Sequence, residues 1–153
     1  MDDIIPIRRP EIIAEVGGLI DECRLTLGVH GENLEPDEVT RTLGCAPTSQ
    51  HRKGEPRRSG PPWPKGAWLL AVEGRSPVGP DELVRLLLDR LPADEATWSA
   101  LRSRYKVQLG FGVFTEGWNR GFELSAESIR RIGIIGVGVG MDIYANLEIG
   151  DDG

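Results

Sequence analysis

The sequence predicts an α+β fold, namely a single-domain two-layer sandwich in which helices pack on one face of a mainly antiparallel sheet of about four to five strands. Three observations lead to this prediction. Four segments alternate apolar residues with polar residues or glycine at the period of a β-strand. The stretches between them carry apolar residues at helical spacing. The length of 153 residues fits one domain, and 39% hydrophobic residues is enough for a buried core.

Each strand segment places its apolar residues at every second position. Because successive strand side chains point to opposite faces, each strand should bury one face and leave the other polar or empty. One-sided strands of this kind are typical of antiparallel or mixed sheets. The apolar positions are Cys23, Leu25, Leu27 and Val29; Trp68, Leu70 and Val72; Tyr105, Val107, Leu109, Phe111 and Val113; and Ile135, Val137, Val139, Met141, Ile143, Ala145 and Leu147.

Two helices follow from proline at a first turn and leucine or valine at helical spacing. The first begins at Pro36 and ends at Gly44, with apolar residues four apart inside it. The second begins at Pro80 and stops before Pro92, which cannot continue a helix. Their expected buried residues are Val39, Leu43, Leu83, Leu87 and Leu91.

Two further helices are expected later in the chain. One covers residues 93–102 with Trp98 inward. The other has Ser125 as its N-cap, and Leu124 with Ile129 as a hydrophobic staple. Gly133 is expected to end this last helix.

The predicted organisation is an N-terminal arm over residues 1–20, one α+β domain over residues 21–149 and a tail over residues 150–153. A short helix over residues 10–16 is expected within the arm.

Composition disfavours several classes of partner. The net charge of −6 should repel nucleic acid, and no apolar run reaches the ~20 residues of a membrane span.

Cys23 and Cys45 belong to no CxxC motif or Cys/His ladder, so we expect free thiols and no metal or other cofactor. The N-terminus has no basic leader, so a cytoplasmic location is expected.

The stretch over residues 44–66 is a basic, proline-rich loop. Its five Lys or Arg residues against one Glu give +4, which leaves −10 on the rest of the chain. Arginine and exposed backbone N–H groups bind phosphate and carboxylate well, and long loops are often functional. The alternative interpretation is a solvated loop held by local salt bridges. The candidate ligand-binding residues are His51, Arg52, Lys53, Arg57, Arg58 and the following Trp68.

A second candidate surface is the polar face of the sheet, which is rich in glycine. Gly28, Gly110 and Gly112 occupy polar-face positions, and the run from Gly136 to Gly140 lacks the strand-to-helix turn of a dinucleotide-binding loop. Glycine in a strand marks a bend or a close approach of a backbone, partner or ligand. The face is therefore either a docking surface or a twisted, partly exposed sheet.

The remaining polar candidates are isolated. His30 ends the first strand on its polar face, where we expect it to be exposed. Asp142 falls on the same face, and we interpret it as one half of a cross-strand pair with Arg24 or Lys106. No nucleophile, paired-carboxylate or zinc-ligand pattern is evident.

The chain resembles a bacterial family catalogued as domain of unknown function 4279. The resemblance rests on Leu34-Glu35-Pro36-Asp37-Glu38 before Leu43-Gly44, on Pro47-Thr48 before His51-Arg52-Lys53-Gly54-Glu55, and on the ending Met141-Asp142-Ile143-Tyr144. It runs over residues 23–147. It implies that the basic loop and the tryptophan after it are characteristic of the family, and it implies no catalytic residues. The insert over residues 56–64 departs from the family pattern.

Two functions compete on these observations. The first is a small non-enzymatic binding or interaction module whose partner is another protein, of which immunity proteins that neutralise toxins are one example. The second is a binder of a small anionic ligand, or an enzyme, that uses residues 51–58 against the glycine-rich sheet face.

Overall fold

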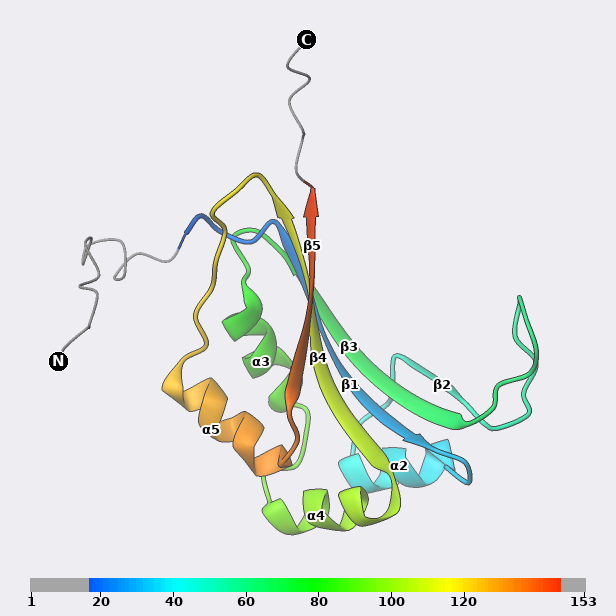
Figure 1. Cartoon of the computed structure of the whole chain (residues 1–153). Coiled ribbons are helices and arrows are strands. Elements are labelled where there is room, and N and C mark those ends of the chain that lie inside the picture. The colour runs from blue at the N-terminus through cyan, green and yellow to red at the C-terminus, as the bar shows by residue number, and fades with distance from the viewer. Residues whose placement is uncertain (1–16, 147–153) are drawn as a thin grey trace, which may run out of the picture.

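The computed structural model describes residues 17–146, and in this part of the chain four helices cover one face of a five-stranded open sheet (Figure 1). In the strand order β2-β3-β1-β4-β5, neighbours are antiparallel except β4 and β5, which are parallel. The strands are β1 (Glu22–Gly31), β2 (Ser49–His51), β3 (Gly66–Arg75), β4 (Lys106–Glu116) and β5 (Val139–Asn146). The helices are α2 (Pro36–Leu43), α3 (Pro80–Leu88), α4 (Glu95–Arg104) and α5 (Ala126–Ile135). The α+β prediction is therefore confirmed.

The central strand β1 follows the predicted alternation fully. Its residues Cys23, Leu25, Leu27 and Val29 are each 0% exposed, because β3 and β4 flank the strand and the helices cover this side. The inward positions of β3 and β4 are buried in the same way. Alternation thus predicted the buried face of the three central strands.

The helix ends match the local signals in most places. Pro36 and Pro80 open α2 and α3, and Gly44 ends α2 in the left-handed region at φ 71°. The Asp94 side chain accepts the Thr97 backbone N–H at 3.0 Å, which caps α4. The Ser125 hydroxyl accepts the Ser128 N–H at 3.1 Å and caps α5.

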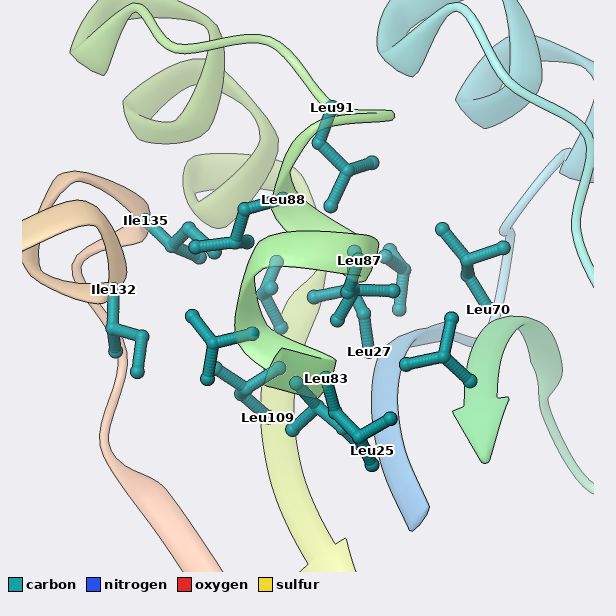
Figure 2. Close-up of a cluster of buried hydrophobic side chains, with 14 of the residues drawn as sticks. Leu25, Leu27, Leu70, Leu83, Leu87, Leu88, Leu91, Leu109, Ile132 and Ile135 are labelled. Carbon is teal, nitrogen blue, oxygen red and sulfur yellow. The ribbon is translucent and has the colours of Figure 1, made fainter. Parts of the chain in front are cut away.

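The core lies between the sheet and the helices. Figure 2 shows Leu83 and Leu87 of α3 directed at Leu25, Leu27 and Leu109 of the sheet. All five side chains are 3% exposed or less. A fully buried leucine contributes about 2–3 kcal/mol of transfer free energy, so this layer is a main source of stability.

The C-terminal segment differs from its prediction. Ile135 is buried, but it lies in α5, which continues through Gly133 and ends at Gly136 with φ 74°. The strand begins at Val139, and it is an edge strand in which Met141 is 46% exposed and Ile143 is 63% exposed. The prediction of a buried apolar side along this strand is wrong, because no described helix covers its far half.

Ile129 of the expected staple is 59% exposed. One smaller expectation also changes. The basic loop is not free of regular structure, because β2 pairs with β3 and turns residues 52–65 into the tip of a hairpin. Figure 1 shows this hairpin tip extending away from the helices.

Some expectations lie outside the described residues: the helix over residues 10–16, most of the N-terminal arm, Leu147, and the tail over residues 150–153. Within the described residues, every helix is too short to cross a bilayer.

Candidate functional site

The sheet face opposite the helices is open and concave. A shallow hollow of about 840 Å³ lies over β1, β4 and the start of β5, with Leu69 of β3 at its side. Because paired residues on neighbouring strands share a face, the strand register determines which side chains meet there. We call this surface the open face.

The open face consists of rows that cross the strands. In each row the residues are direct register partners. From one end to the other the rows are His51, Ala67, His30 and Lys106; Ser49, Leu69, Gly28 and Gln108; Ala71, Thr26, Gly110 and Gly140; Glu73, Arg24, Gly112 and Asp142; and Arg75, Glu22, Phe114 and Tyr144.

The middle of the open face is formed by backbone. We call Gly28, Gly110, Gly112 and Gly140 the glycine floor. A Cβ atom added at Gly110 or Gly112 would meet its nearest neighbour at 3.8 Å, and one at Gly140 would meet nothing within 4 Å. The fold therefore leaves room for side chains at these three positions, and the hollow exists because they are glycine.

Charged and aromatic side chains stand around the floor. Arg24 and Glu73 are cross-strand partners whose Nη1 and Oε1 atoms lie 3.6 Å apart. This pairing corrects one interpretation, since Arg24 pairs with Glu73 and Asp142 lies across Gly112 from it. At the far end, Phe114 and Tyr144 stack with centroids 4.8 Å apart.

His30 is the polar residue most closely associated with the floor. Its imidazole folds back over Gly28, so that Nε2 lies 2.8 Å from the position a Gly28 Cβ would take. Burial lowers the pKa of His30, and the neighbouring positive groups His51, Lys106 and Lys65 lower it further. From the sequence, His30 was expected to be exposed at the end of its strand. Gly28 lies two residues earlier on the same face, and its missing side chain was the signal that the His30 ring could lie over it.

Most of the cations of the hairpin tip already contact other groups of the chain. Arg52 Nη2 lies 3.0 Å from a Glu35 carboxylate oxygen, and Lys53 Nζ lies 3.8 Å from Glu32. The Arg57 guanidinium stacks over Trp63 at 4.6 Å, and its Nε donates to the Pro61 carbonyl at 2.6 Å. Arg52 and Lys53 thus pair with carboxylates outside the loop, and only the contacts of Arg57 are local to it.

The structure therefore does not bring the candidate residues of the loop together in one site. Only His51 lies in a row of the open face, where its ring stacks on Trp63 with centroids 3.7 Å apart. Arg52, Lys53 and Arg58 are exposed on the hairpin tip. The prediction that Trp68 binds a ligand is wrong. Trp68 lies in the core, where it is 0% exposed and its Nε1–H donates to Thr40 Oγ1 at 3.0 Å.

The two cysteines are free thiols, and burial raises the pKa of each. Glu22 and Glu82 raise the pKa of Cys23 further, whereas Arg90 opposes the effect at Cys45. A raised pKa keeps a thiol protonated and weakly nucleophilic. Among residues 17–146, no group of three His, Cys, Asp or Glu side chains is arranged to hold a metal ion.

Comparison with known proteins shows a family but no function. No curated protein and no solved structure matches the chain. A family model described as Domain of unknown function (DUF4279) matches residues 21–146, which span all five strands and all four helices of the described structure. The chain is therefore a member of the DUF4279 family.

Proposed function

We propose that this protein is a non-enzymatic binding module that holds its ligand on the open face of the sheet. The observation that carries the proposal is the glycine floor. Gly110, Gly112 and Gly140 leave a hollow in the middle of the sheet although the fold has room for side chains there.

These glycines have a thermodynamic cost. Glycine within a strand destabilises a protein by roughly 0.5–1 kcal/mol relative to alanine, because glycine loses more backbone conformational entropy on folding. Three such positions therefore cost about 2 kcal/mol, which is a noticeable part of a typical stability of about 5–15 kcal/mol. A bare floor allows a ligand to approach the backbone closely, which is a recognised use of glycine in strands.

The surroundings of the floor suit a polar ligand with an apolar part. Gln108, Thr26 and Arg24 present hydrogen-bonding groups along the hollow, and Arg24 is paired with Glu73. The Phe114–Tyr144 stack lies at one end and the basic residues His30 and Lys106 at the other. Ligand sites commonly combine an apolar lining with a few polar groups that fix orientation.

The test is a thermal-shift and calorimetric screen of phosphate, nucleotides and dicarboxylates. Gly110→Val fills the floor and should fold, because the site has room and β-branched residues favour strands. The matched control is Arg52→Ala/Lys53→Ala on the hairpin tip. We expect a ligand that stabilises wild type and the hairpin variant but has a much smaller effect on Gly110→Val.

Two results would contradict the proposal. One is a ligand that binds Gly110→Val as tightly as wild type. The other is a ligand whose effect disappears in the hairpin variant, which would move the binding site to residues 52–65.

A protein partner is the second candidate, and the edge strand β5 favours it. Among the described strands only β4 pairs with β5, and Met141, Ile143 and Tyr144 are 46%, 63% and 55% exposed. Exposed apolar edges of this kind are templates for pairing with another chain.

The partner tested first is a second copy. Antiparallel pairing centred on Ile143 would join two copies of β5 with the same face outward and would place Asp142 opposite Tyr144 rather than opposite itself. Light scattering should then give twice the 16.8 kDa chain mass, and Ile143→Lys should restore the single mass. A wild-type protein that stays monomeric at high concentration would exclude this partner.

A further inference from the structure

We infer that the end of the open face formed by His30, His51 and Lys106 binds an oxyanion, a carboxylate or a phosphate-like group. This inference rests on the proposed function, because it names the part of the ligand that this end recognises. Of the ligand-binding residues predicted from the sequence, the site contains only His51, whereas Arg52, Lys53, Arg57 and Arg58 lie on the hairpin tip.

The register brings these groups together. Ala67 pairs with His51 on one side and with His30 on the other, and His30 pairs with Lys106. Neighbouring strands lie about 4.8 Å apart, so the three side chains rise from one row about 14 Å long. Ala67 contributes only a methyl group and is 3% exposed, so the polar groups of this row come from the two histidines and Lys106.

The His30 ring is positioned to meet a ligand on the glycine floor. Its Nε2 atom lies over Gly28, in the row next to the cationic one. No residue within the described part of the chain forms a hydrogen bond with the His30 side chain or a salt bridge with Lys106. Both groups thus have donor capacity left for a ligand.

The electrostatic environment is positive at this end. Burial is the largest cause of the lowered pKa of His30, and the positive groups His51, Lys106 and Lys65 lower it further. Burial also lowers the pKa of His51, with Arg57 acting in the same direction and with Glu55 and the Lys65 backbone opposing it. An oxyanion would neutralise this repulsion, so binding should be accompanied by proton uptake on the histidines.

The chain provides its own probe, because His30 and His51 are its only two histidines. Their ring signals can be followed by NMR across a pH titration in sodium sulfate, in sodium succinate and in sodium chloride at matched ionic strength. The charge of sulfate is constant over this range, and chloride controls for screening. Sulfate represents phosphate-like groups and succinate represents carboxylates.

We expect sulfate or succinate to shift the titration midpoint of His30 upward relative to chloride, and Lys106→Gln to reduce that shift. Which of the two anions is effective identifies the class of oxyanion. Lys53→Gln is the matched control, since it removes the same charge from the hairpin tip, where Lys53 pairs with Glu32; it should leave the shift unchanged.

The inference is overturned if His30 titrates identically in all three salts, or if Lys53→Gln reduces the shift as much as Lys106→Gln. These outcomes are distinguishable from failure of the proposed function. Binding that Gly110→Val abolishes while the histidines do not respond would keep the open face as the site and remove the oxyanion from it. A histidine response without any ligand on the floor would keep the oxyanion site and remove the glycine floor as a binding site.

Discussion

Truncation of Leu109 and truncation of Val139 should have very different effects, although the sequence pattern places both on the buried side of a strand. Leu109 is 3% exposed in β4, and Figure 2 shows it beneath α3 with Leu83 and Leu87. Val139 is its register partner in β5, but it lies at the edge of the sheet and is only partly buried.

The magnitudes follow from the atoms removed. Leu109→Ala deletes three buried carbons, worth about 2.4 kcal/mol at roughly 0.8 kcal/mol each. The cavity left under a rigid helix adds to this, for a total of about 3–5 kcal/mol. Val139→Ala deletes two carbons that are already partly in water, so its cost should stay at about 1 kcal/mol or less.

Urea denaturation followed by circular dichroism measures both values. With a slope of about 2 kcal/mol per molar, Leu109→Ala should lower the midpoint by roughly 1.5–2.5 M, and Val139→Ala by about 0.5 M or less. Equal shifts for the two variants would refute the assignment of β5 as a partly exposed edge strand.

The other predictions concern the glycines, the histidine and the thiols. Gly110→Ala should leave the melting temperature unchanged or raise it slightly. Gly66→Ala should lower the melting temperature, because a Cβ atom there would lie 3.0 Å from Leu34 Cβ. If calorimetry gave the reverse order of melting temperatures, it would contradict the account of the floor. His30→Asn should flatten the pH dependence of stability: the pKa of His30 is lowered in the folded state, so the unfolded chain binds the proton more tightly and wild type loses stability as the pH falls below about 6.5. A wild-type melting temperature that rises on acidification through this range, or an equally steep loss in the variant, would count against that reasoning. Mass spectrometry of native protein should show both cysteines reduced, and a two-proton deficit would contradict the free thiols.

The central part of the fold was predictable because it follows one physical rule. Alternation along β1 and β4 places the apolar residues on one face, with Phe114 as the exception, and a slip of one residue would expose the buried set. Pro36, Pro80 and Ser125 likewise located the starts of α2, α3 and α5. These signals are local, so a single sequence contains them.

The edge strand was less predictable because its environment is not local. Residues from Val139 onward alternate as clearly as those of β1, but burial depends on what covers them, and no described helix lies over Met141 or Ile143. The end of α5 was misplaced for a related reason, since Gly133 tolerates helical geometry and Gly136 is the residue with positive φ.

The candidate site was predictable in part. Strand parity located the glycine-rich face, and composition singled out the basic residues 44–66, which include β2 and the hairpin tip. Pairing of its cations with Glu35 and Glu32 and burial of Trp68 depend on tertiary contacts that loop composition does not encode. The row that joins His51 to His30 depends on the β2–β3 register, which a three-residue strand does not reveal.

The most direct test of the binding face is an NMR titration of ¹⁵N-labelled protein with the anion that stabilises it most in the screen. The amide signals of Gly28, Gly110, Gly112 and Gly140 report on the floor itself, and those of residues 52–65 report on the hairpin tip. We predict that the largest shifts fall on the floor glycines and on His30 and Lys106 beside them. Shifts concentrated on residues 52–65, with the floor glycines unmoved, would contradict the account.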